Sequence, residues 1–145
     1  MARVLVVYGP NLNLLGEREP DVYGRETLED ITTRMRDAAA REGVTLEVFH
    51  SNSEGAIIDR LHAARREADA VVLNPGALTH YSYALRDAIA AIGIPVVEVH
   101  MTNTAAREPF RRRSVLSAVC AGGVHGFGVN SFLLGLRAAI DLIRR

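Results

Sequence analysis

Short apolar runs alternate with longer amphipathic segments along this chain of 145 residues. Runs rich in Val, Leu and Ile predict strands over residues 4–8, 44–49, 70–73 and 96–99, and a Gly-rich stretch predicts a short fifth strand within residues 122–128. The first run is continuous rather than alternating, which is typical of a strand buried on both faces of a parallel sheet. The alternation of strands with helix-length segments predicts the α/β class.

Capping residues mark the helices between these strands. Thr27 followed by Asp30 has the pattern of a capping box at a helix start. Ser53 and Thr79 stand where two further helices are expected to begin. The remaining predicted helical segments are one or two turns over residues 107–113 and a closing helix over residues 131–144.

The whole chain, residues 1–145, is expected to form one domain: a doubly wound, five-stranded parallel sheet of flavodoxin-like order with helices on both faces. Residues 9–24 interrupt this rhythm, because neither a helical nor a strand period survives there. Such long connections commonly act as lids or binding loops. Arg18 and Tyr23 lie within it, and a cation held close to a phenol would favour the phenolate, which is a base. The simpler alternative is a surface arginine and a turn-anchoring tyrosine.

Composition excludes several kinds of chemistry. All seventeen basic residues are Arg, so no Schiff-base, pyridoxal-phosphate or P-loop lysine is available. They balance seventeen acidic residues, and this balance favours neither nucleic acid nor a membrane surface as a partner. No apolar run reaches the length of a membrane span, and the first residues lack the pattern of a signal peptide. We therefore expect a cytoplasmic protein.

Metal and disulfide chemistry have little support in the sequence. Cys120 is the only cysteine, so it can form neither a disulfide within the chain nor a thiolate cluster. His50, His62 and His125 show no metal-ligand spacing, and no HExxH motif occurs. We expect no metal site and assign these histidines to the structure or to chance.

Polar residues follow each of the four strong strand predictions, at residues 11–13, 50–52, 74–76 and 100–103. The carboxyl ends of parallel strands meet at one edge of the sheet, which is where ligands bind in open α/β folds. Asn, Gly and Pro also form ordinary turns, and we prefer that interpretation for the other asparagines. For Asn11 and Asn74, which begin their turns nearest the point where the strand order reverses, a functional role is the better interpretation.

His100 is the most informative single residue. The strand period of two places Glu98 and His100 on the same side, where the carboxylate can orient the imidazole for general acid catalysis. A structural histidine at a strand end is the simpler alternative. His80 follows the predicted helix start at Thr79, where the helix dipole suits a neutral, hydrogen-bonding imidazole. Asp87 lies seven residues further on and would share its helix face, although an acid that is solvated or lies at an interface remains a strong alternative.

Arginines cluster after the fourth strand. Arg107 and Arg111 are four residues apart and would share a helical face, whereas Arg112 and Arg113 rotate away from it. The first two could therefore grip an anion or a hydroxyl near His100. The other two are expected in solvent.

Several separated segments resemble the type II 3-dehydroquinate dehydratases in order and spacing across essentially the whole chain. They are GPNLNLLG (9–16), REP with YG (18–24), NPGALTH (74–80), ALRDA (84–88), EVH (98–100) and REPFR (107–111). The resemblance implies a flavodoxin-like fold and a lyase that dehydrates 3-dehydroquinate to 3-dehydroshikimate, in the shikimate pathway or in quinate breakdown. It further implies a homododecamer built of trimers, and no metal or organic cofactor.

The same resemblance implies a role for each matching residue. Tyr23 would be the base that removes a proton from C2 of the substrate, with Arg18 keeping it reactive. Asn11 would help to stabilise the enolate through a water, and His100, oriented by Glu98, would protonate the departing C1 hydroxyl. Substrate contacts would come from Asn74, His80, Asp87, Met101, Thr102, Arg107 and Arg111. The absence of lysine agrees with this chemistry, because the unrelated type I enzymes need a Schiff-base lysine.

Three positions depart from the common pattern of that family: Thr102 stands where Ser is usual, Pro109 where an acid is frequent, and Ala118 where Pro often follows the Ser. Thr102 keeps the hydroxyl, so the pocket should be only slightly tighter. A rival class is a flavodoxin-like binding or electron-transfer module. Residues 9–13 lack the hydroxyls of a flavin phosphate loop, however, and the chain has no Trp to stack on a flavin. An inactive scaffold would not need the set of residues named above.

Overall fold

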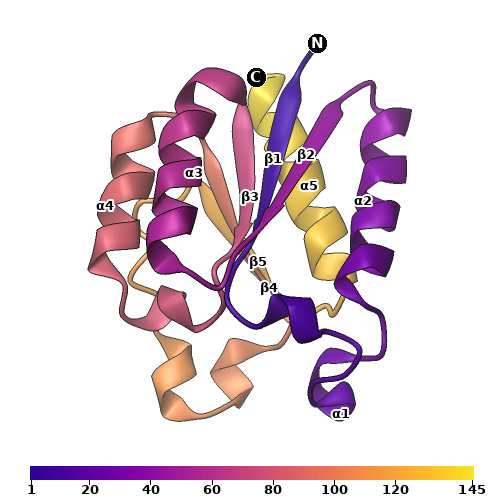
Figure 1. The fold of residues 1–145 in the computed structure, drawn as a ribbon, viewed down its shortest axis with the longest axis vertical. Helices are drawn as coiled ribbons and strands as arrows, with labels where there is room; N and C mark the ends of the chain where they lie inside the picture. The colour runs from indigo at the N-terminus through magenta and orange to yellow at the C-terminus, as the bar shows by residue number, and fades with distance from the viewer.

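The structure, a computed structural model, describes residues 1–145 and contains one five-stranded sheet (Figure 1). Its strands are β1 (Arg3–Tyr8), β2 (Thr45–His50), β3 (Ala70–Asn74), β4 (Val96–His100) and β5 (Gly122–His125). They lie in the order β2-β1-β3-β4-β5, and every neighbouring pair is parallel. The predicted α/β class and flavodoxin-like order are therefore confirmed.

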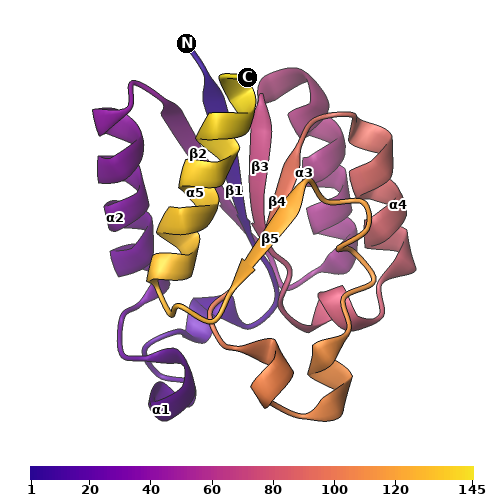
Figure 2. The same cartoon turned by 180° about the vertical axis from the view of Figure 1, so that it is seen from behind.

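Two helices cover each face of the sheet, as Figures 1 and 2 show from opposite sides. The helices are α2 (Leu28–Arg41) and α5 (Asn130–Ile143) on one face and α3 (Glu54–Glu67) and α4 (Tyr83–Ile92) on the other. Alternate residues of β1 serve the two layers: Val4 and Val6 pack toward α2 and α5, whereas Leu5 and Val7 pack toward α3 and α4. None of the helices combines the length and the apolar character needed to cross a lipid bilayer.

Local capping explains where two of the helices begin. Thr27 and Asp30 form the reciprocal capping box at the start of α2. The Ser53 hydroxyl accepts the backbone N–H of Ala56 at 3.2 Å at the start of α3. Each bond satisfies a donor that the first turn would otherwise leave free, and both predictions are confirmed.

The predicted helix start at Thr79 is wrong. The Ser82 hydroxyl accepts the N–H of Leu85 at 3.0 Å, and α4 begins at the next residue after Ser82. Thr79 lies instead in a short 3-10 helix, η2 (Gly76–His80), and its hydroxyl donates to Glu98. Both hydroxyls are good caps, so the local sequence could not choose between them. Thr79 is instead bound to the carboxylate of Glu98 on β4, which leaves Ser82 as the cap.

The two long connections contain short helical turns. Residues 9–24, predicted to be irregular, form η1 (Leu12–Leu14) and α1 (Pro20–Tyr23). After β4 the chain forms η3 (Thr104–Ala106) and η4 (Pro109–Arg112), with Arg107 in an extended conformation between them. The expectation that Arg107 and Arg111 share one helix is therefore wrong. A proline at the start of α1 and of η4 fixes φ for a helical turn, which explains both short helices.

Gly135 allows α5 to lie close against β4. A Cβ atom added there would lie 2.5 Å from Cγ2 of Val99 and 3.5 Å from Cγ1 of Val72. Both valines are fully buried in the sheet. The missing side chain thus sets the distance between this helix and the strand that carries Glu98 and His100.

We expect Gly135→Ala to destabilise the protein by about 1–3 kcal/mol, because the new methyl group overpacks the interface between α5 and β4. Gly55→Ala in α3 is a matched control, because its Cβ would meet nothing closer than the Ser53 hydroxyl at 3.9 Å. It should be neutral or stabilising by up to about 1 kcal/mol. Urea unfolding measures both, and equal stabilities for the two variants would contradict this account of the helix position.

Candidate active site

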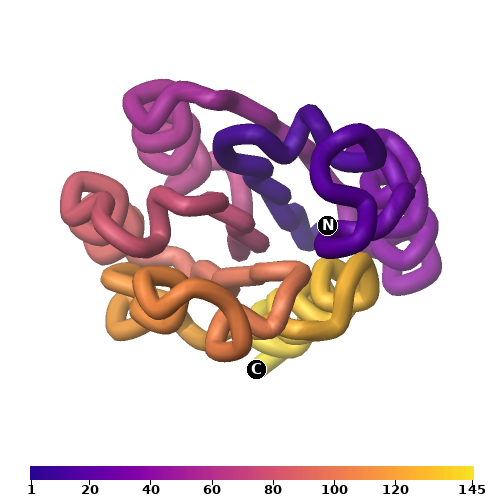
Figure 3. The backbone as a smooth tube through the Cα atoms, turned by 90° about the horizontal axis from the view of Figure 1, so that it is seen from below, coloured from indigo at the N-terminus to yellow at the C-terminus, as the bar shows by residue number.

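A cavity lies at the carboxyl edge of the sheet, where the turns after β1, β3 and β4 meet. Figure 3 looks onto this edge, with residues 9–24 in indigo and the segment after β4 in orange. Of the residues predicted for the site, all except Glu98 and Asp87 line the cavity: Asn11, Arg18, Tyr23, Asn74, His80, His100, Met101, Thr102, Arg107 and Arg111. The structure therefore brings together side chains from distant parts of the sequence.

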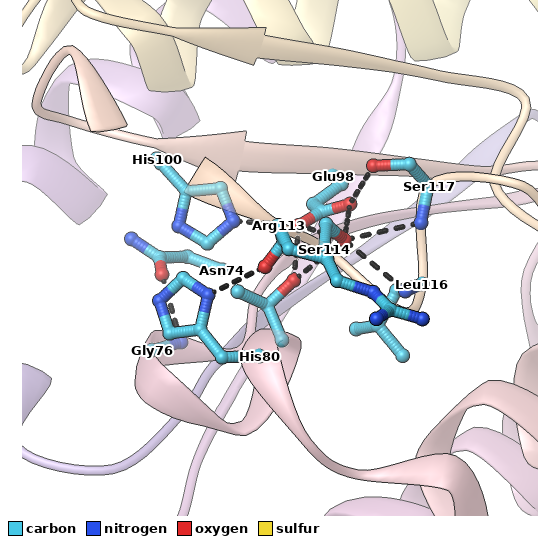
Figure 4. Close-up of polar contacts among 10 residues, drawn as sticks. Asn74, Gly76, His80, Glu98, His100, Arg113, Ser114, Leu116 and Ser117 are labelled. Atoms are coloured by element: carbon cyan, nitrogen blue, oxygen red, sulfur yellow. Dashed lines mark hydrogen bonds and ion pairs between the residues drawn. The ribbon is translucent and has the colours of Figure 1, made fainter. Parts of the chain in front are cut away.

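The side chains of Glu98 and His100 are in hydrogen-bond contact at the end of β4. The strand places them on the same side, and Oε2 of Glu98 lies 2.6 Å from Nε2 of His100 (Figure 4). The side chain of Glu98 is only 4% exposed and that of His100 is 16% exposed. The short contact fixes the ring and leaves its other nitrogen free. His100 lines the cavity, whereas Glu98 lies behind it.

Three hydroxyl groups also bind the Glu98 carboxylate. Thr79 donates to Oε2, Ser114 lies 2.9 and 3.0 Å from the two oxygens, and Ser117 donates to Oε1 at 3.2 Å. Burial acts to raise the pKa of Glu98, but the hydrogen bonds from His100, Thr79 and Ser114 and the charge of His100 hold it below its ordinary value. Sequence reasoning missed all three hydroxyls, and the only available signal was the pair of serines after the arginine cluster.

Two arginines lie over the ring of Tyr23. The guanidinium carbon of Arg18 is 4.7 Å from the ring centroid, and that of Arg107 is 5.2 Å from it. Arg107 is itself held by a 3.2 Å hydrogen bond to the Thr102 hydroxyl. The predicted proximity of Arg18 to Tyr23 is present, and the second arginine is an addition that the sequence did not reveal. The structure therefore places two guanidiniums against one phenol ring at the cavity.

His80 lies at the end of η2 rather than at the start of α4, so the helix-dipole argument for it is wrong. Its Nδ1 is 2.7 Å from the carbonyl oxygen of Arg113, and since a carbonyl only accepts, Nδ1 carries a proton. The ring also packs edge-on against Phe110, at 5.5 Å between centroids. These contacts orient the ring at the cavity wall.

Asp87 does not join the site in this chain. It lies exposed on α4, and because His80 is outside that helix the two cannot share a helix face. The seven-residue spacing argument is therefore wrong. The structure places Asp87 on the outer surface of the helix layer.

The two asparagines at the switch point are fixed by their own turns. Asn11 adopts a left-handed backbone with φ of 72°, and its N–H donates to the Asn52 side chain at 2.8 Å. Asn74 is 4% exposed, and its side-chain oxygen accepts the N–H of Gly76 at 3.1 Å. That bond leaves the amide NH₂ of Asn74 as a donor at the cavity wall.

Arg111 reaches the cavity from η4. Its Nε donates to Glu108 at 3.1 Å, and its guanidinium lies 4.7 Å from the ring centroid of Phe110. Arg107 also lies near Glu108, at 3.8 Å. One exposed acid therefore holds both arginines at the cavity, although they do not belong to one helix.

The remaining histidines and the cysteine do not line the main cavity. His62 and His125 are exposed, and His50 is half-buried with no hydrogen-bond partner at Nε2. Burial, followed by the nearby charge of Glu98, raises the pKa of Cys120 to about 12, so its thiol stays protonated and unreactive. No group of three or more His, Cys, Asp or Glu side chains is placed to hold a metal ion.

The fold and the site define a flavodoxin-like α/β protein with the groups for general acid–base chemistry at the carboxyl edge of its sheet. Residues 2–140 match the family described as dehydroquinase class II, and the chain belongs to that family.

Individual relatives agree with this assignment over nearly the full chain. The 3-dehydroquinate dehydratase of Desulforudis audaxviator is 61% identical over 143 residues, covering 99% of this chain and 95% of that protein. The protein of the same name from Pelotomaculum thermopropionicum is 56% identical over 140 residues, covering 97% of each. The crystal structure of the type II dehydroquinase from Butyrivibrio crossotus is 41% identical, with a TM-score of 0.92, and covers 99% of this chain and 98% of that one.

Replacing Glu98 with Gln should change how stability depends on pH. A carboxyl whose pKa is lowered by folding contributes stability that is present above its ordinary pKa of 4.5 and is lost as the pH falls through its folded value. The free energy of unfolding of the unaltered protein should therefore fall more steeply below about pH 5 than that of Glu98→Gln. Urea unfolding over a pH series measures this difference.

Other carboxyls with lowered pKa values do not affect the difference between the two stability curves. Asp30, Glu42 and Glu108 also have lowered pKa values, but they are present in both proteins. Their contributions cancel when one curve is subtracted from the other. Two parallel curves would mean that Glu98 is not stabilised as a carboxylate.

Proposed function

We propose that this chain is a type II 3-dehydroquinate dehydratase, which converts 3-dehydroquinate into 3-dehydroshikimate in the shikimate pathway. The names of its relatives support the activity, and one observation of the site carries the mechanism. A phenol with two guanidiniums over its ring and an imidazole paired with a carboxylate line the same cavity. The first is suited to remove a proton and the second to deliver one, which an elimination of water requires.

Tyr23 is the base in this proposal. A free phenol is mostly protonated at neutral pH. The groups available to assist its ionisation are Arg18 and Arg107, whose guanidinium carbons lie 4.7 and 5.2 Å from the centre of the ring. The phenolate takes the proton from C2 of the substrate and leaves an enolate. Residues 9–24 act as a lid that excludes water over the site, which strengthens the attraction between these charges.

His100 is the acid. Held by Glu98, its imidazolium gives a proton to the C1 hydroxyl, which leaves as water from the face opposite the lost proton, in an anti elimination. Asn11 stabilises the enolate oxygen between the two steps, acting through a water. No lysine exists in the sequence to form an imine, so hydrogen bonds and electrostatics stabilise the intermediate.

The substrate is held by donors around the cavity wall. A carboxylate and several hydroxyl groups need cations and polar donors, and the proposed contacts are Asn74, His80, Met101, Thr102, Arg107 and Arg111, all of which line the cavity. Asp87 lies outside the cavity of its own chain. Its proposed contact with substrate therefore requires that it reach the site of another subunit, within a homododecamer built of trimers.

The proposed reaction needs neither a metal nor an organic cofactor, because both proton transfers are assigned to side chains. We place the enzyme in the cytoplasm, where the pathway supplies its substrate. The direct test is a continuous absorbance assay for the conjugated enone of 3-dehydroshikimate, with purified protein and 3-dehydroquinate. No absorbance change at any protein concentration would refute the proposed activity.

Tyr23→Phe should reduce kcat by about a hundredfold to ten-thousandfold, because the phenyl ring cannot take a proton. Arg18→Gln should also be slow, and its residual activity should rise toward higher pH, since the phenol must then ionise with less help. Tyr83→Phe and Arg34→Gln, at exposed sites outside the cavity, are the matched controls. A wild-type rate and pH profile for Arg18→Gln would mean that another group is the base.

His100→Ala should bind 3-dehydroquinate but turn over at least about a hundredfold more slowly, the low end of what a positioned general acid contributes. Glu98→Gln should cost less, since it disturbs the imidazole but leaves a proton donor in place. Calorimetric titration gives the affinity and the enone assay gives kcat. Near-normal turnover of His100→Ala would mean that His100 has only a structural role and is not the acid.

A further inference from the structure

The carboxylate of Glu98 sits in a cradle of three hydroxyls that belong to other segments of the chain. The hydroxyl cradle consists of Thr79 from η2 and of Ser114 and Ser117 from the segment after η4. Figure 4 shows Ser114 and Ser117 close to Glu98, with His100 also beside it. Together with the imidazole, the cradle supplies partners for both carboxylate oxygens.

The contacts around Ser114 determine the direction of these bonds. Its hydroxyl accepts the backbone N–H groups of Leu116 and Ser117, each at 3.1 Å, so its lone pairs are occupied. Its one proton is left for Glu98 or for the Thr79 hydroxyl, which lies 2.8 Å away. In the first case Ser114 donates to the carboxylate directly. In the second it donates to Thr79, which in turn donates to Glu98.

A cradle of donors distinguishes the two forms of the acid. A protonated carboxyl would find only Nε2 of His100 to accept its proton, whereas the carboxylate can accept from that nitrogen and from every hydroxyl around it. Burial alone would favour the neutral acid. The balance is in favour of the anion, since the pKa of Glu98 is lowered although its side chain is only 4% exposed.

We propose that Thr79, Ser114 and Ser117 are positioning residues that act on the reaction through Glu98. By holding Glu98 ionised and directed at Nε2, they fix the His100 ring in place and give the proton on Nε2 a negatively charged partner. These contacts are independent of what the chain catalyses. Their consequence for catalysis rests on the proposed function, in which the imidazole delivers a proton to the leaving hydroxyl.

Other charged groups face the pair and must be held constant in any test. On one side, His80, Arg111, Arg112 and His125 line a second hollow that Glu98 and His100 also border. On the other side lie the arginines and the tyrosine of the main cavity. The Cys120 thiol is near Glu98, but its raised pKa keeps it neutral. A comparison of hydroxyl variants leaves all of these groups unchanged.

Thr79→Val and Thr79→Ser form the decisive pair. Valine has nearly the shape of threonine but no hydroxyl, whereas serine keeps the hydroxyl and loses a methyl group. The imidazole of His100 is followed by NMR over a pH series in the ligand-free protein, with His100→Asn used to assign its signal. We expect Thr79→Val to move the titration midpoint of His100 downward by about one pH unit, because a Glu98 that takes up a proton no longer attracts the imidazolium. Thr79→Ser should keep the midpoint near the wild-type value. An upward shift, which a more basic but still ionised carboxylate would give, contradicts the proposal.

The same two variants are then assayed for dehydration. For Thr79→Val the fall in kcat on the alkaline side of the pH profile should move to lower pH with little change in KM, and Thr79→Ser should restore the original profile. Because the NMR titration needs no substrate, it tests the cradle even if the chain dehydrates nothing. An inactive protein with a shifted midpoint would thus refute the proposed function and support the cradle.

Thr32→Val is the matched control, since the Thr32 hydroxyl bonds to the Tyr8 hydroxyl at 2.9 Å, away from the site. It should leave the His100 titration unchanged. If Thr79→Val lowers thermal stability but does not move the midpoint, Thr79 is only structural and the proposal fails. If Thr79→Val does not fold, Ser117→Ala replaces it, because Ser117 is exposed and gives a single bond. A smaller shift in the same direction supports the proposal, and an unchanged midpoint overturns it.

Discussion

Glu98 brings a negative charge into the interior at the carboxyl end of β4, and much of the surrounding structure serves to accommodate it. An unpaired buried carboxylate would cost several kcal/mol, so each of its oxygens needs donors. The fold supplies them from His100 on the same strand and from hydroxyls on two other segments. The first of these segments, η2, also carries His80 to the cavity wall. The second, residues 114–117, follows the turn that carries Arg111. Satisfying one charge therefore shapes the cavity.

The parallel sheet determines which turns share that cavity. Because β1 lies between β2 and β3, the chain leaves β1 and β3 in different directions and opens a crevice between their turns. The two turns pack backbone to backbone, since a Cβ on Gly9 would lie 2.7 Å from the carbonyl carbon of Pro75. This contact fixes Asn11 and Asn74 on the two sides of one narrow switch point.

The proposed acid and base differ in how rigidly they are held. His100 belongs to a strand and is fixed by a buried carboxylate, so its position follows from the core. Tyr23 belongs to a short helix in the 9–24 connection, and its partners are arginines that reach it from two loops. A rigid acid and a base assembled from loops suit a site that must admit a substrate and then enclose it.

The sequence by itself determined the features that depend on local periodicity. Continuous apolar runs predicted the strands and their parallel order, and the period of two placed Glu98 beside His100. Only the tertiary structure decided that Thr79 binds Glu98 instead of capping α4, that Arg107 joins Arg18 at Tyr23, and that Asp87 lies outside the cavity. A capping hydroxyl, an arginine in a loop and an acid on a helix each have several possible partners that the local sequence does not distinguish. The tertiary packing decides which partner each one meets, because it brings together segments that are far apart in the sequence.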